Sequence, residues 1–279
     1  MRLRSILAST VFAAAATVLA AGSASAAPIN FTWSPSNVGL TGGLITGVNN
    51  FNVADFATIT VGAGGAFTET GALNVTGFLN NGTSVVTTGL GSTYSLYYTF
   101  NATGNQGGPI PVLNGTSVTG TFSSLSYTLW ASPTSNPTFT VGAGGVAITG
   151  NAGAFALATG SMVGGGAANT VTLTKLSSGL SPSANIEVSL DVCTGAGGAC
   201  TIDASLFFVS PDATSTVLQF GNFGATTTVT SLHGNQVWIN GGGGNITQDV
   251  VVPEPVTLSL FGAGLAGIAA VRRRKAKKA

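Results

Sequence analysis

The sequence predicts an all-β fold, an antiparallel β-sandwich of jelly-roll-like or immunoglobulin-like architecture, for the long region between its two ends. Three observations favour it. Apolar and polar residues alternate with a period of two in many short runs, these runs are rich in Val, Thr, Tyr and Phe, and clusters of Gly, Asn, Pro and Ser separate them. Such closely spaced turns are typical of antiparallel sandwiches. No segment of residues 27–252 has convincing helical periodicity.

The alternation is clearest in residues 185–192, where Ile186, Val188 and Leu190 point to one face and polar residues point to the other. This pattern predicts a strand with one buried face. Comparable runs predict further strands at residues 51–61, 73–79, 94–100, 121–130, 138–148, 170–176, 202–209, 216–220, 226–232 and 236–240.

The stretch Val-Gly-Ala-Gly-Gly occurs twice, at residues 61–65 and 141–145. A duplicated half-sandwich would produce this echo, and so would two independent glycine-rich turns. We favour independent turns because the echo has no sustained period. The glycine runs at residues 164–166, 195–198 and 241–244 are also interpreted as flexible turns, since none matches the spacing of a phosphate-binding loop.

Residues 1–26 have the three parts of a secretory signal peptide: Arg2 and Arg4, an apolar run from Ile6, and small residues at Ala24 and Ala26. We expect cleavage after Ala26, which leaves residues 27–252 as a secreted all-β domain. An uncleaved membrane anchor fits less well, because the apolar run is short, rich in Ala and followed directly by an Ala-Ser-Ala site.

Residues 253–279 form a second signal. A motif of Pro253, Glu254 and Pro255 precedes the uncharged stretch 256–271 and a basic tail at 272–279 that begins with Arg272, Arg273, Arg274 and Lys275. At about 1.5 Å per residue, the uncharged stretch is a short transmembrane helix for a bilayer core of ~30 Å. The basic tail should stay in the cytoplasm, so the preceding chain lies beyond the inner membrane, in agreement with the first signal.

This tail resembles that of the PEP-CTERM proteins of Gram-negative bacteria that make exopolysaccharide. The resemblance implies that the C-terminal helix holds the chain in the inner membrane transiently. It also implies that a transpeptidase-like membrane enzyme, exosortase, cuts near Pro253 and passes the protein to the cell surface or extracellular matrix. The match is confined to the tail and describes sorting rather than the β-domain.

Charge excludes one class of partner. Between residues 27 and 252, Lys175 is the single basic residue, and seven acids give a formal charge of −6: Asp55, Glu69, Glu187, Asp191, Asp203, Asp212 and Asp249. Nucleic-acid binding needs clustered Lys and Arg, so we expect none. Abundant Thr, Ser and Asn would keep the surface hydrated without charge.

Cys193 and Cys200 are the only cysteines, and they flank a short glycine-rich stretch after a predicted strand. In an oxidising compartment this spacing predicts a disulfide that closes a hairpin loop, worth about 2.5 kcal/mol on the loop-entropy estimate. A redox or metal role would need a closer C-x-x-C pair or further ligands.

We assign no catalytic, cofactor or metal residues. His233 is the only histidine, and no nucleophile elbow accompanies it, so we interpret it as a turn residue. Some pair among seven acids always arises by chance, so a glycosidase pair is a weak hypothesis. The acids are isolated, without the repeats typical of calcium loops, although a calcium ion is left open.

Several internal stretches resemble the flocculation-associated PEP-CTERM proteins. They are residues 67–78 (FTETGALNVTGF), 94–104 (YSLYYTFNATG), 158–164 (ATGSMVG) and the glycines 241–244. This resemblance implies a secreted, non-enzymatic matrix protein that helps cells coated with exopolysaccharide to aggregate.

Two functional hypotheses follow from the sequence. The first is a non-enzymatic matrix protein that binds exopolysaccharide and self-associates through sheet edges. The second is a sorted carbohydrate-binding module or glycoside-active enzyme. Aromatic residues that could stack on sugars favour sugar binding, although aromatics on strands are usually core; they are Tyr94, Tyr97, Tyr98, Tyr127, Trp130 and Trp238.

Overall fold

The computed structural model describes residues 29–250, apart from 86–88, 135–136, 164–168, 178, 196, 211–215 and 225–229. The expected all-β class is confirmed, because the described residues form β-strands and two short 3-10 turns but no α-helix. None of their helices could cross a bilayer. The signal peptide 1–26 and the sorting tail 253–279, with its expected transmembrane helix 256–271, lie outside the described residues.

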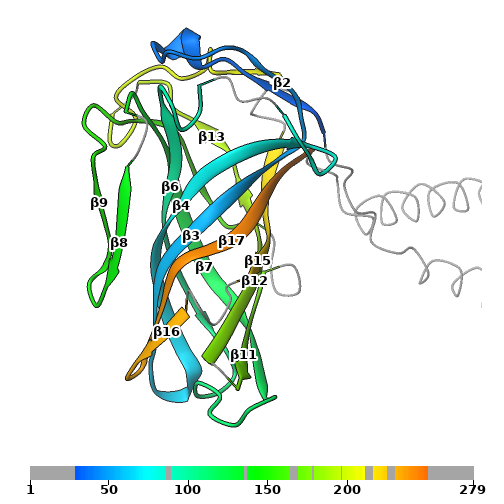
Figure 1. Ribbon diagram of the computed structural model, residues 1–279, viewed down its shortest axis with the longest axis vertical. Helices are drawn as coiled ribbons and strands as arrows, with labels where there is room; N and C mark the ends of the chain where they lie inside the picture. Colours follow the sequence, from blue (N-terminus) through cyan, green and yellow to red (C-terminus); the bar gives the residue numbers. More distant parts are fainter. Residues whose placement is uncertain are drawn as a thin grey trace, which may run out of the picture. The chain divides into compact units, whose positions relative to one another are not determined.

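Eight long strands form the body of the molecule, and each pairs with its neighbours in antiparallel fashion (Figure 1). In spatial order they are β11 (Thr170–Leu176), β12 (Gly179–Ser189), β15 (Thr216–Gly224), β17 (Gln236–Val250), β3 (Asn50–Val61), β4 (Ala66–Asn80), β6 (Ser95–Asn105) and β7 (Ser117–Ser132). The first part of β7 pairs in turn with β11, from Thr170 opposite Thr121 to Thr174 opposite Ser117. Strand pairing therefore runs unbroken around the core, instead of ending at the free edges of two separate facing sheets.

The same sheet contains four shorter strands. The second part of β7 pairs with β10 (Phe155–Ser161), and β10 pairs with β13 (Asp191–Val192). Two further strands lie at the margins, β5 (Thr83–Ser84) beside β4 and β16 (Thr230–His233) beside β17. Strand β7 thus changes neighbour along its length, from β11 to β10.

The glycines at 241–244 lie inside β17 and not in a flexible turn as expected. Gly242, Gly243 and Gly244 pair with consecutive residues of β3, after a register shift at Gly241. Gly241 has a φ of 90°, which favours glycine, and a bulge of this kind bends a strand. The run therefore bends the sheet where it curves around the core.

One end of the molecule is covered by a small sheet of β14 (Phe208–Ser210), β1 (Phe31–Trp33) and β2 (Ile45–Val48), with the 3-10 turn η2 (Pro35–Val38) between β1 and β2. Trp33 is buried at its centre and packs against five phenylalanine rings at centroid distances of 4.5–6.2 Å, those of Phe31, Phe51, Phe78, Phe207 and Phe208. Such aromatic contacts join the small sheet to β3 and β4.

Residues 138–148 form a hairpin and not the single strand expected. Strand β8 (Thr138–Gly142) turns at the second Val-Gly-Ala-Gly-Gly stretch and pairs with β9 (Gly145–Thr149), because Gly145 adopts a φ of 105° that the turn requires. The first copy, with the 3-10 turn η3 (Ala63–Gly65), connects β3 to β4. Phe139 of the hairpin packs on Phe56 outside the closed sheet, with ring centroids 4.9 Å apart.

The predicted strand at residues 202–209 is mostly a turn, and only β14 is extended. The backbone N–H of Ser205 donates to Asp203 Oδ1 at 2.9 Å, and the N–H of Phe207 donates to the carbonyl of Ala204 at 3.0 Å. A side chain that accepts a hydrogen bond two residues ahead stabilises a turn in place of a strand.

Inside the closed sheet, three cross-strand pairs place an aromatic ring over a glycine. Phe100 lies over Gly71, and Tyr127 lies over Gly160. A third pair joins Phe67 and Gly104. A β-carbon at any of the three glycines would lie 2.4–2.5 Å from the ring, so only glycine leaves room for it.

Candidate functional site

The candidate site is a hydroxyl-rich depression on the outside of β6, β7 and β10. It encloses about 430 Å³. Most of its side chains come from alternate, outward positions of these strands, and the inward residues Tyr127 and Gly160 contribute to its floor. The lining residues are Thr99, Asn101, Ser126, Tyr127, Thr128, Thr159, Gly160, Ser161 and Asp191.

Strand register arranges these polar side chains in two rows that cross the three strands. Thr128 of β7 lies between Thr99 and Thr159. In the next row, Ser126 lies between Asn101 and Ser161. Adjacent strands are about 4.8 Å apart, so each row presents hydrogen-bonding groups at a regular short spacing. We call these two rows the hydroxyl face.

Trp130 borders the hydroxyl face. Its indole Nε1 donates to Thr99 Oγ1 at 2.9 Å, which fixes the side chain beside the first row. Thr99 also lines a second depression of about 280 Å³ together with Tyr97, Trp130, Ile148 and Asn151. The two depressions therefore share Thr99 as a lining residue, and the ring of Trp130 lies beside it.

Of the aromatic residues considered for sugar stacking, four are core residues. Tyr94, Tyr97, Tyr98 and Tyr127 are buried. Tyr127 donates its hydroxyl to the carbonyl of Ser189 at 2.7 Å, and burial, followed by the charge of Asp191, raises its pKa well above the usual range. Trp130 and Trp238 remain partly exposed and can contact a ligand.

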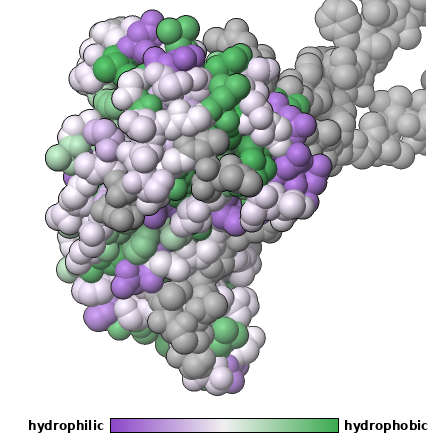
Figure 2. Space-filling model, turned by 45° about the horizontal axis from the view of Figure 1, so that its top comes forward, coloured by the Kyte–Doolittle hydropathy of each residue, from purple (hydrophilic) through white to green (hydrophobic). Residues whose placement is uncertain are grey.

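The hydroxyl face has almost no charge. Asp191 is the only ionisable carboxylate among its lining residues, and Ser189 Oγ donates to Asp191 Oδ2 at 2.9 Å. The basic side chain of Lys175 lies on β11, where Nζ donates to the carbonyl of Leu176 at 2.8 Å. Over the view in Figure 2 most described residues are pale, as expected for Thr, Ser and Gly.

A second array of polar residues follows β7 towards its start and extends over β11 and β12. Thr119 lies opposite Thr172, with hydroxyl oxygens 3.1 Å apart, and Ser117 lies opposite Thr174, at 3.0 Å. These hydroxyls bond to one another across the strands. Ser117 and Thr119 are exposed, as are Asn101, Ser126 and Ser161 of the hydroxyl face.

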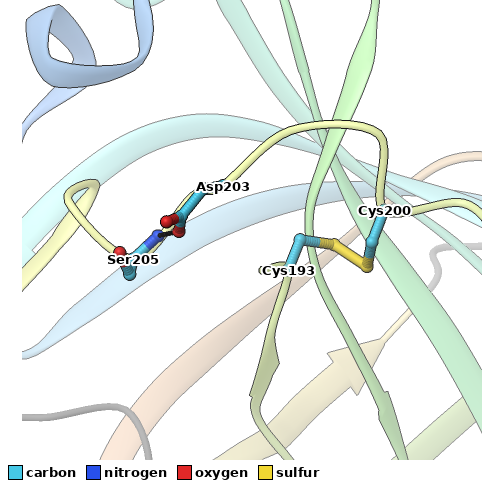
Figure 3. Close-up of a disulfide and its surroundings, with 4 residues drawn as sticks. All are labelled: Cys193, Cys200, Asp203 and Ser205. Atoms are coloured by element: carbon cyan, nitrogen blue, oxygen red, sulfur yellow. Dashed lines mark hydrogen bonds between the residues drawn. A yellow bond between two sulfur atoms is a disulfide. The ribbon is translucent and has the colours of Figure 1, made fainter. Parts of the chain in front are cut away.

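The disulfide between Cys193 and Cys200 is confirmed (Figure 3). Cys193 is fully buried after β13, and the closed loop leads to Asp203 and Ser205 in the following turn. The hydrogen bond from Ser205 lowers the pKa of Asp203. The pair holds the end of β13 beside this turn.

His233 ends β16 on the surface. Its ring stacks on Trp238 with centroids 3.8 Å apart, and its Nε2 lies 3.1 Å from Ser231 Oγ. Within the described ranges, no three His, Cys, Asp or Glu side chains gather as a metal site.

Sequence reasoning missed one arrangement of acids. Asp55 and Glu69 are both buried inside the closed sheet and line a common interior cavity. A signal for this existed, because Asp55 is in phase with the inward residues Phe51, Val53 and Ile59 of the same strand. An acid at a position where the alternation predicts an apolar residue indicates a buried carboxyl.

Comparison with known proteins identifies a known motif in the C-terminal tail. Residues 251–275 match the PEP-CTERM protein-sorting motif. The chain carries a PEP-CTERM sorting signal. No curated protein and no solved structure matches the chain.

The PEP-CTERM signal identifies exosortase as the sorting partner and indicates export to the cell surface or the extracellular space. The sorting motif Pro253, Glu254 and Pro255 lies within the matched residues. This destination gives the β-domain an extracellular setting, in which a disulfide is stable. The resemblance to flocculation-associated proteins stays a prediction.

Proposed function

We propose that this PEP-CTERM protein is a non-enzymatic surface or matrix protein whose hydroxyl face binds neutral exopolysaccharide and so promotes flocculation or biofilm cohesion. The observation that supports it is the pair of polar rows on β6, β7 and β10, bordered by Trp130. Its destination outside the cell supplies the setting in which such a ligand is abundant.

The chemistry of the hydroxyl face suits a sugar chain. Each Ser or Thr hydroxyl can donate one hydrogen bond and accept two, and Asn101 adds an amide that does both. Sugar hydroxyls have the same dual capacity, and the partly exposed ring of Trp130 offers an apolar surface to a pyranose. An open row also accepts a chain that continues beyond it at both ends, as a polymer must.

Charge favours a neutral polymer. The depression contains Asp191 and no Lys or Arg, and the region 27–252 has a formal charge of −6. An anionic polysaccharide would be repelled, because the face offers no basic group to compensate it. Each contact is weak in water, so cohesion depends on many copies that bind one polymer.

The glycosidase alternative lacks support from the acids. A glycosidase needs two carboxyls on opposite sides of an accessible glycosidic bond. Asp55 and Glu69 instead line an interior cavity of about 40 Å³, which has space for a few waters rather than a sugar ring.

Deletion of the gene in its native host tests the proposal. The strain is complemented with the full chain, with a chain that ends at Val252, or with a full chain in which Asn101, Ser126 and Ser161 are alanine. We expect flocs to disperse on deletion and to be restored by the full chain alone. Unchanged aggregation in the deletion strain would refute the floc assignment, and rescue by the alanine variant would refute the hydroxyl face.

A further inference from the structure

Two acids face the interior of the closed sheet, where every other lining side chain is uncharged. Asp55 on β3 is 7% exposed and Glu69 on β4 is 9% exposed. Glu69 lies opposite Ile59, and Asp55 lies opposite Leu73, so both carboxyls project from the same face of the hairpin. They differ from the acids of the outer surface in being largely shielded from bulk water.

The cavity between these acids and the facing wall has a volume of about 40 Å³. A buried water needs roughly 10–15 Å³, so about three waters fit. Apolar side chains from five other strands complete the wall: Phe100 of β6, Phe122 and Leu125 of β7, Val171 of β11, Ile186 of β12 and Ile239 of β17. No other lining residue is titratable, and none is basic.

Asp55 Oδ1 has no hydrogen-bond partner. An ionised carboxylate in this position would pay a large desolvation cost without a compensating cation. Burial raises the pKa of Asp55 to about 7. Burial, and then the charge of Asp55, raises the pKa of Glu69 to about 8.

We propose that Asp55 and Glu69 form a buried proton-binding site that keeps the sheet closed when both carboxyls are protonated and loosens it when they ionise. Ionisation draws water into the cavity, because each carboxylate needs solvation that the apolar wall cannot supply. The β3–β4 hairpin and the wall formed by β11 and β12 are then less tightly packed. A matrix protein with this device is most resistant to unfolding in acid surroundings.

The direction of the pH effect follows from the raised pKa values. In the unfolded chain both acids ionise near pH 4, whereas in the folded chain they do so near pH 7 and 8. The folded state therefore binds more protons between these limits, and stability decreases as pH rises. The stability that the two protonated acids contribute is complete below pH about 4 and is lost as the pH rises through about 7 for Asp55 and about 8 for Glu69.

Chemical denaturation of the mature protein at pH 5, 6, 7, 8 and 9 tests this site. We expect the unfolding equilibrium constant of the wild type to rise by about tenfold or more per pH unit between pH 5 and 7. The double variant Asp55→Asn, Glu69→Gln should lose most of this dependence. Glu187→Gln, on the outward side of β12, removes one carboxyl from the surface and should keep the pH dependence.

A wild type without pH dependence in this range, or a double variant that keeps it, would overturn the proposal. If the double variant fails to fold, hydrogen exchange on the wild type decides instead. Amides of β3 and β4 should then exchange faster at pH 8.5 than at pH 5.5, after correction for intrinsic exchange, and equal protection would refute the site.

Stabilisation at pH 9 by 5 mM CaCl₂ in the wild type, absent from the double variant, would identify a metal site and contradict the proton proposal.

Discussion

The inner and outer faces of the closed sheet are built from the same strands but differ sharply in chemistry. On β4, inward positions hold Phe67, Leu73 and Val75 with one buried acid, whereas outward positions hold mainly Thr and Asn. Inward residues stabilise the fold by burial, and outward residues keep a low-charge surface available for a ligand. Two neighbouring residues on one strand should therefore respond very differently to the same change.

The largest difference in the free energy of unfolding is expected between a variant with an added acid on the inner side of β4 and one with an added acid on its outer side. Leu73→Asp places a third carboxyl in the interior cavity, and we expect a loss of more than about 4 kcal/mol in the free energy of unfolding, or no folding at pH 7. Asn74→Asp on the outer side should change it by less than about 0.5 kcal/mol. Urea denaturation measures both, and a similar cost at the two positions would contradict the assigned faces.

A β-carbon added under a ring is expected to cost less than a buried charge. In Gly160→Ala the new atom would lie 2.1 Å from the carbonyl oxygen of Ser189 and 2.4 Å from the Tyr127 ring, and we expect about 3 kcal/mol of destabilisation. Gly77→Ala is the control, because a β-carbon there meets nothing within 4 Å. Thermal denaturation compares the two, and equal melting temperatures would show that β7 and β10 do not pack as described.

The next prediction concerns the loop after β13, which the disulfide closes and which lies outside the long alternating strands. Cys193→Ser with Cys200→Ser should lower the free energy of unfolding by about 2.5 kcal/mol, because the unfolded chain regains the entropy of the closed loop. The effect should appear in denaturation without reductant. A double variant as stable as the wild type would indicate that the loop is held by its hydrogen bonds alone.

The strand pattern could be predicted from sequence because period-two alternation is local. Residues 170–176 were predicted as a strand and form β11 with the same bounds. The hairpin at 138–149 and the strand glycines at 241–244 were missed, since glycine permits turns and bulges equally and the choice depends on the neighbouring strand. Closure between β7 and β11 joins residues about fifty positions apart, and no local pattern encodes it.

The candidate site was predictable only in its composition. An uncharged Thr, Ser and Asn surface follows directly from the residue counts, but the rows depend on which residues of β6, β7 and β10 lie opposite one another. Register across three strands is fixed by tertiary packing and turn geometry. For the same reason, the sequence alone does not indicate that Trp130 is partly exposed whereas the tyrosines are buried.

Alanine at the exposed row of the hydroxyl face is expected to give the smallest change in stability. The triple variant Asn101→Ala, Ser126→Ala, Ser161→Ala removes polar groups from exposed positions, so its free energy of unfolding should stay within about 1 kcal/mol of the wild type. Urea denaturation measures it. A much larger loss would show that this row stabilises the fold.

The most direct test of the account is calorimetric titration of the mature protein with neutral exopolysaccharide isolated from the host. We predict that the wild type binds and that the triple variant loses at least about tenfold in affinity, a loss of 1.4 kcal/mol. The control Thr83→Ala, Ser84→Ala, which changes exposed hydroxyls on β5, should bind like the wild type. Equal binding by the triple variant, or no binding by the wild type, would contradict a sugar-binding role for the hydroxyl face.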